Sequence, residues 1–181
     1  MDEAARWLWL AGEGTLWTLL AVSLVTDLWR GLVYNWVTLP AAAMGLVLAG
    51  LRFGAPGLLS SGLGLVIGGG VFLLPFLLGA VGGGDVKLMA ALGSLVGPVL
   101  VLKTALYACV LGGAVALGVM ARQGGLGRNL RDLAAFFTAL VTPGQRPAAP
   151  RSLGLPPIPF AACIAVGFLW ARYWDLLAPW A

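Results

Sequence analysis

The chain has 181 residues, of which 60% are hydrophobic and 10% are charged, and its formal net charge is +4. About a quarter of the residues of an ordinary soluble domain are charged, so this composition excludes a soluble domain and indicates an integral membrane protein. The chain has no histidine, and its two cysteines, Cys109 and Cys163, lie in different apolar segments, which excludes most metal sites, Ser-His and Cys-His catalysis, and a CxxC redox motif.

Six apolar runs are long enough to be membrane helices, because the core of a bilayer needs roughly 20 apolar residues per helix. They lie at about 7–29, 36–51, 57–80, 86–102, 104–121 and 157–177. We therefore predict an all-α membrane protein in which residues 1–181 form a single transmembrane domain, a polytopic bundle of six helices. The third run is rich in glycine, and Gly64 and Gly68 stand four positions apart, which favours close packing against another helix.

The basic residues are distributed unevenly between the predicted loops. If the N-terminus lies outside, seven of the 11 basic residues fall on the inner side and four fall on the outer side. The positive-inside rule then predicts that both termini lie outside, and this asymmetry accounts for the net charge without a nucleic-acid partner. Asp27 closes the first predicted helix and Asp85 opens the fourth, so both lie on the cytoplasmic side.

One long connection, residues 122–152, joins the fifth and sixth predicted helices. Within it, apolar residues of the segment 126–141 recur at helical spacing, while Arg128, Arg131 and Asp132 lie on the opposite arc. This pattern predicts an amphipathic helix in the cytoplasmic headgroup layer. A connector helix that packs on the bundle and binds nothing fits the same pattern equally well.

The two aspartates have a structural and a functional interpretation. Asp85 could cap its own helix, and Asp27 could pair with Arg30 on the next turn. Against the cap, Gly82, Gly83 and Gly84 precede Asp85; three residues without side chains let an extended peptide approach and allow unusual dihedral angles. Two carboxylates on one side of a bundle suit an aspartic protease, in which one takes a proton from water and the other polarises the scissile carbonyl.

Three segments carry a resemblance to a known family. GGGDVKL at 82–88 resembles the GxGD active-site motif of the type IV prepilin peptidases, which are intramembrane aspartyl proteases. TDLWRGLVYNWVTLP at 26–40 and LPPIPFAACIAVGF at 155–168 resemble the end of the family's first helix and its final helix. The resemblance implies that Asp27 and Asp85 are the catalytic pair of an endopeptidase that removes the leader peptide from prepilins at the cytoplasmic face of the bacterial inner membrane.

The resemblance also bears on substrates and cofactors. The insert with two CxxC zinc pairs, which longer members carry, is absent, and this indicates the short peptidase-only branch that processes Flp (tight-adherence) pilins. It implies neither a cofactor nor a metal. The expected partners are membrane lipid and a prepilin with an apolar helical stalk. We expect Gly82, Gly83 and Gly84 to contact the cleavage junction, and Lys87 either to attract an acidic group of the substrate or to extend toward the lipid headgroups.

Two other functions are compatible with parts of the sequence. In a small proton- or cation-coupled transporter or channel subunit, Asp27 and Asp85 would form a relay, but the other acidic residues within predicted spans, Glu13 and Asp175, lie near outer ends. A protease of the signal-peptide-peptidase type would share GxGD. It would also be expected to have a Tyr-Asp pair and a Pro-Ala-Leu motif, which VTDLW and LPPIPF do not supply.

Overall fold

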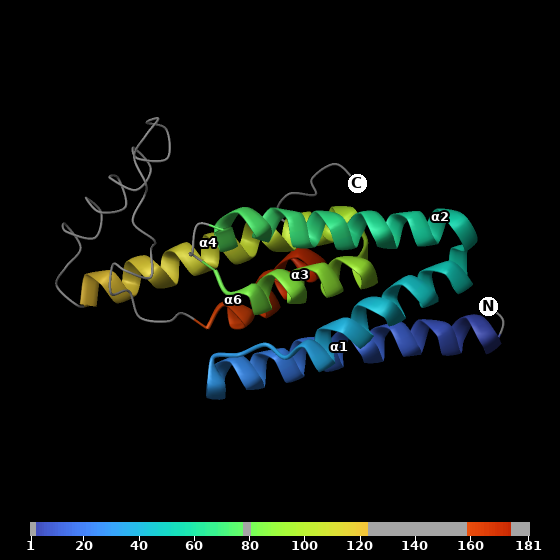
Figure 1. The fold of residues 1–181 in the computed structure, drawn as a ribbon, viewed down its shortest axis with the longest axis horizontal. Helices are drawn as coiled ribbons and strands as arrows, with labels where there is room; N and C mark the ends of the chain where they lie inside the picture. The colour runs from blue at the N-terminus through green and yellow to red at the C-terminus, as the bar shows by residue number, and fades with distance from the viewer. Residues whose placement is uncertain (1–2, 78–80, 123–158, 175–181) are drawn as a thin grey trace.

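The computed structural model describes residues 3–77, 81–122 and 159–174, and this part of the chain is helical without strands. The helices, shown in Figure 1, are α1 (Glu3–Arg30), α2 (Asn35–Leu77), α3 (Gly83–Val96), α4 (Pro98–Arg122) and α6 (Phe160–Tyr173). The predicted all-α class is therefore confirmed for these residues. The predicted amphipathic helix at 126–141 lies outside the described residues.

Helix α2 consists of two arms that meet at Gly54. This residue has φ 63° and ψ −145° inside the 43-residue element, a left-handed conformation that glycine adopts without steric cost. In Figure 1 the two arms run in opposite directions, so α2 reverses at the end of the bundle where α1 begins. The sequence predicts that one helix ends at about residue 51 and the next begins at about residue 57, and the break at Gly54 confirms this.

Among the described residues, three helices are long and apolar enough to cross a membrane: Glu3–Arg30, Asn35–Leu77 and Pro98–Val119. The chain is therefore a membrane protein on both composition and helix length. Helices α3 and α6 are shorter, with 14 residues each. The count of six spans stays a prediction.

The boundary predicted between the fourth and fifth helices is wrong. Helix α3 ends at Val96 and α4 begins at Pro98, whereas the sequence analysis extends one helix to residue 102. Gly97 has φ 82° and Pro98 is the first residue of α4, where its missing N–H costs no helical hydrogen bond. This Gly-Pro pair ends one helix and starts the next inside a continuous apolar run.

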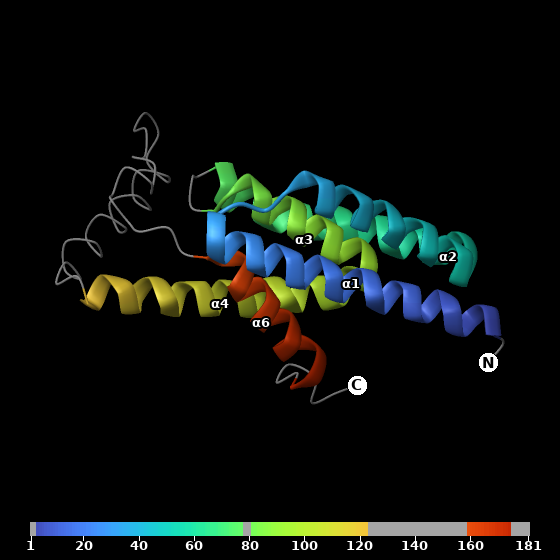
Figure 2. The same cartoon turned by 90° about the horizontal axis from the view of Figure 1, so that it is seen from below.

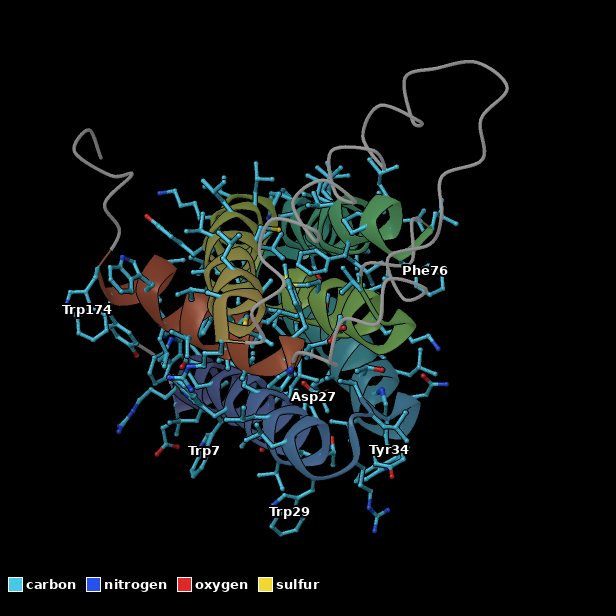
Figure 3. All side chains as sticks on the ribbon, turned by 90° about the vertical axis from the view of Figure 1, so that its left-hand side faces the viewer. Trp7, Asp27, Trp29, Tyr34, Phe76 and Trp174 are labelled. Carbon is cyan, nitrogen blue, oxygen red and sulfur yellow. The ribbon has the colours of Figure 1, made fainter. Side chains whose placement is uncertain are left out.

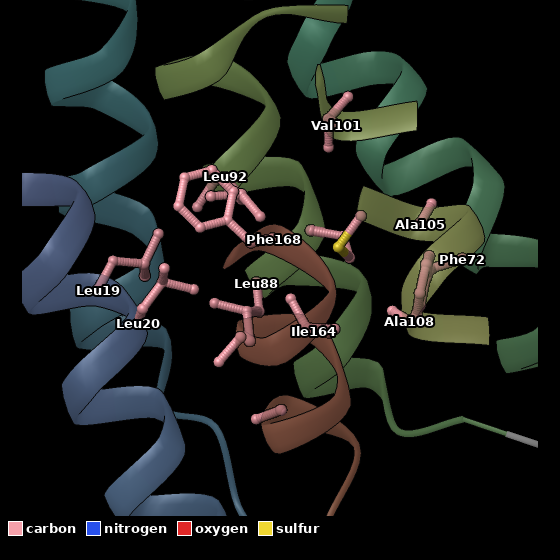
Figure 4. Close-up of a cluster of buried hydrophobic side chains, with 14 of the residues drawn as sticks. Leu19, Leu20, Phe72, Leu88, Leu92, Val101, Ala105, Ala108, Ile164 and Phe168 are labelled. Atoms are coloured by element: carbon pink, nitrogen blue, oxygen red, sulfur yellow. The ribbon is translucent and has the colours of Figure 1, made fainter. Parts of the chain in front are cut away.

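Helix α3 lies at the centre of the bundle. Its residues Leu88, Met89, Ala91 and Leu92 are each 0% exposed, and Figure 4 shows Leu88 and Leu92 among side chains from α1, α4 and α6. Figure 2 shows α6 beside the end of α1, and α6 also contacts α4. Helices from both halves of the chain therefore surround the short helix that carries Asp85.

The glycines of α2 bring its second arm against α3. A Cβ atom on Gly64 would collide with the carbonyl oxygen of Gly93, and one on Gly68 would collide with that of Met89. Small residues at these positions let two helix backbones touch, as the spacing of Gly64 and Gly68 predicts. This contact fixes α3, and with it the residues at the start of α3.

Candidate active site

Asp27 lies in the last turn of α1. Gly31, with φ 63°, ends the helix and donates its N–H to the carbonyl oxygen of Asp27 at 2.8 Å, as glycine commonly does just after a helix. The Asp27 carboxylate accepts a hydrogen bond of 3.0 Å from the N–H of Ala161 in the first turn of α6, 134 positions away. Figure 3 shows Asp27 directed between the helices, while Trp29 points outward.

The interpretation that Asp27 pairs with Arg30 is wrong. Arg30 donates from Nη1 to the hydroxyl of Tyr34 at 3.0 Å, because the chain turns at Gly31 and brings Tyr34 beside the exposed end of α1. Asp27 instead faces the start of α6, where the unpaired amides of a helix N-terminus stabilise a carboxylate.

Asp85 is 8% exposed and lies in the first turn of α3. Its Oδ2 accepts the N–H of Gly82 at 3.1 Å, and its own N–H donates to the carbonyl oxygen of Gly82 at 3.1 Å. The capping interpretation is therefore confirmed in part: the N-cap residue is Gly82, and Asp85 reaches back to it from inside the helix. Within the described part of the chain the bond from Gly82 occupies Oδ2 and leaves Oδ1 for another partner.

The carboxyl of Asp85 precedes the predicted span at 86–102 and lies outside the three long apolar helices. Burial raises its pKa to about 6, the hydrogen bond from Gly82 opposes this rise, and the charge of Asp27 adds to it. The two carboxyl groups are therefore close enough to act on each other electrostatically. The thiol of Cys163, a buried residue of α6, lies close enough to interact electrostatically with both carboxyl groups. The structure thus brings together the two aspartates that the sequence singles out.

The three glycines before Asp85 have ordinary backbone angles. None of Gly82, Gly83 and Gly84 has a positive φ, so the expectation of unusual dihedral angles is wrong. A Cβ atom on Gly84 would lie 2.9 Å from Cβ of Val33, and one on Gly83 would lie 3.2 Å from Cε2 of Phe76. Glycine is needed at Gly84 because the turn after α1 packs there. The predicted contact of these glycines with a substrate stays a prediction.

Lys87 connects α3 to the start of α2. Its Nζ donates to Oδ1 of Asn35 at 2.8 Å, on the exposed surface. The sequence reasoning singled out Lys87 but missed this partner, and it also missed Ala161 and Cys163 as neighbours of the aspartates. A signal was available, because Asn35 lies in the segment 26–40 and the other two lie in 155–168.

The described residues contain no group of three or more His, Cys, Asp or Glu side chains that could hold a metal ion. The chemistry that these residues offer is that of two interacting carboxyl groups, one largely buried and one at a helix N-terminus. Such a pair can share a proton and act as acid and base toward a bound molecule.

Comparison with known proteins identifies one family. Residues 15–117 match the type IV leader peptidase family, and this segment includes both aspartates and more than half of the chain. No curated protein and no solved structure gives a significant match. Members of this family are membrane-embedded peptidases whose substrates are prepilins. The chain belongs to the type IV leader peptidase family.

Proposed function

We propose that this protein is an intramembrane aspartic endopeptidase that removes the leader peptide from Flp-like prepilins at the cytoplasmic face of the inner membrane. The observation that carries the proposal is the juxtaposition of Asp27 and Asp85. They come from α1 and α3, lie at one end of the bundle and interact electrostatically, in a chain that belongs to a peptidase family.

The surroundings of the two carboxyl groups differ in degree: each accepts one backbone N–H, and Asp85 is the more deeply buried of the two. Asp27 is less buried than Asp85 and accepts the amide of Ala161 at the N-terminus of α6, which stabilises a negative charge. Asp85 is 8% exposed, and burial disfavours its charged form. We assign Asp27 as the base that takes a proton from water and Asp85 as the acid that polarises the scissile carbonyl.

In this proposal the substrate contacts the bundle in two ways. Its apolar stalk lies as a helix against the apolar surface of the bundle, and its cleavage junction is extended near Gly82 and Gly83, whose backbones are partly accessible. Lys87 lies on the exposed surface at this end and attracts an acidic group of the substrate. The assay for the activity is the decrease in size of a purified prepilin precursor incubated with the enzyme in lipid.

We also propose that the bundle crosses the membrane six times, with both termini outside and the aspartates on the cytoplasmic side. The opposite directions of the two arms of α2 support this count. Exposed tryptophans lie near both ends of α1, and Trp9 and Trp29 are 20 positions apart. This separation corresponds to about 30 Å, the thickness of the hydrocarbon core, at whose edges tryptophan is enriched.

Reporter fusions test this topology. Fusions after residues 30, 84 and 145 should report a cytoplasmic location, and a fusion after residue 54 should report an external one, because α2 reverses at Gly54. A cytoplasmic signal from the fusion at residue 54 would contradict the topology and the shared side of the two aspartates.

Lys87→Ala should reduce cleavage without abolishing it. The substitution removes the exposed charge that attracts an acidic group of the substrate in this proposal. An exposed ion pair contributes up to about 1 kcal/mol, which corresponds to a decrease of about fivefold in kcat/KM. Asn35→Ala is the matched variant, since it removes the hydrogen bond between Asn35 and Lys87 and keeps the ammonium group. A total loss of cleavage in Lys87→Ala would show that Lys87 takes part in the chemistry, contrary to this proposal.

A further inference from the structure

A cavity lies at the opposite end of the bundle from the two aspartates. It is open on one side, has a volume of about 160 Å³, and is lined by residues of α1, α2 and α3, among them Gly12, Arg52, Ser60, Ser61 and Ser94. Gly12 precedes Asp27 by 15 positions on α1, which places the cavity about 22 Å along the helix axis from the carboxylates. It is therefore separate from the candidate active site.

The cation in this cavity has no anionic partner among the described residues. The guanidinium of Arg52 donates from Nη2 to the carbonyl oxygen of Leu8, while its buried Nε has no acceptor. Glu13, an acidic residue of α1 near the cavity, is bound to Arg172 at 2.7 Å. A guanidinium has five N–H donors arranged for a planar oxyanion. The buried Nε is closed to a ligand, so in the described part of the chain Nη1 and the second hydrogen of Nη2 are left for one.

The serines around the cavity do not satisfy Arg52. Ser61 donates from Oγ to the carbonyl oxygen of Ser94 at 2.6 Å, and Ser94 donates to that of Ala91 at 2.8 Å. Ser60 is exposed and stands at the opening, where its hydroxyl is available to a ligand. The site therefore offers one guanidinium and one hydroxyl as donors and no carboxylate, which suits an anion.

The level of the cavity in the membrane identifies the source of the anion. Arg52 contacts the backbone at Leu8, and the flanking Trp7 and Trp9 are 69% and 51% exposed. Tryptophans at this position mark the headgroup layer, about 30 Å from the layer marked by Trp29 at the other end of α1. Phosphate groups of lipids lie in that layer. We propose that the cavity binds the phosphate of an anionic phospholipid through Arg52, with Ser60 at its rim.

Lipid titration of the purified full-length protein in detergent tests this site. Phosphatidylglycerol should bind and raise the thermal unfolding temperature, because a ligand of the native state stabilises it. Diacylglycerol, which has no phosphate, should leave the temperature unchanged. Stabilisation by inorganic phosphate alone, to the same extent as by phosphatidylglycerol, would overturn the lipid as the source of the anion. Equal stabilisation by diacylglycerol would overturn the role of phosphate.

Two pairs of variants locate the binding at Arg52. Arg52→Gln should weaken phosphatidylglycerol binding about tenfold through loss of a charge-assisted contact, whereas Arg6→Gln removes an exposed charge of α1 and should have little effect. Similar losses in both would overturn the proposal.

The second pair keeps the charge. A Cβ atom on Gly12 would lie 2.8 Å from Nη2 of Arg52, and one on Gly14 would meet nothing within 4 Å. Gly12→Ala should therefore displace the guanidinium and weaken binding, while Gly14→Ala should bind normally. Normal binding by Gly12→Ala would contradict the site even if Arg52→Gln failed to fold.

Discussion

Asp27→Asn and Asp85→Asn should each lower the rate of leader cleavage by a factor of about 10³ or more, because general acid and base catalysis depends on a carboxyl group at each position. Asparagine keeps the size of the side chain and can still accept the hydrogen bonds from Ala161 and Gly82. Both variants should therefore insert and purify normally. The measurement is the size shift of the prepilin precursor under single-turnover conditions.

Glu13→Gln is the matched control for this loss. It replaces a carboxylate by an amide on the same helix as Asp27, near the opposite end, and the amide can still accept from Arg172. Its cleavage rate should stay close to that of the unmodified protein. Normal cleavage by either aspartate variant would contradict the catalytic pair and favour the relay of a proton- or cation-coupled transporter. If an aspartate variant lost cleavage because it failed to fold, it would aggregate, and gel filtration would detect the aggregate.

Gly64→Val should destabilise the folded protein by about 3 kcal/mol, which corresponds to a decrease of roughly 6–12 °C in Tm. The added Cβ would collide with the carbonyl oxygen of Gly93, and a backbone atom of a buried helix cannot move aside as the tip of a long side chain can. The second arm of α2 would then separate from α3, the helix that carries Asp85. Thermal unfolding in detergent measures the effect.

Gly62→Val provides the comparison on the same arm of α2. A Cβ atom there would meet nothing within 4 Å, and both substitutions introduce the same β-branched side chain into the same helix. Gly62→Val should therefore lower Tm much less than Gly64→Val. Equal decreases would show that helix propensity, and not the contact with α3, determines the effect.

Several features of the fold follow from local sequence. The apolar composition predicts the helical membrane class, and the interruption after residue 51 predicts the reversal found at Gly54. The four-residue spacing of Gly64 and Gly68 predicts a close helix contact, although it does not identify α3 as the partner. These features depend on a few neighbouring residues, which is why composition and periodicity are sufficient to find them.

Other features depend on residues far apart in the chain. Two aspartates on one side of the bundle were predicted from topology and motif, but the hydrogen bond from Ala161 to Asp27 spans 134 positions. The contact between Lys87 and Asn35 spans 52 positions. Neither leaves a periodic pattern in the sequence. The boundary at Gly97 was missed because the apolar run continues through it, and only the Gly-Pro pair indicates a break.

The contact between α6 and Asp27 limits how far the chain can be shortened without loss of activity. Residues 15–117 match the family and contain both carboxyl groups, yet the amide that holds Asp27 comes from Ala161. Ile164 and Phe168 of the same helix are 0% exposed against the other helices. A fragment truncated after α4 would keep both acids but would open one wall of the bundle beside them to lipid. The C-terminal helix is therefore part of the enzyme, and not an appendage to it.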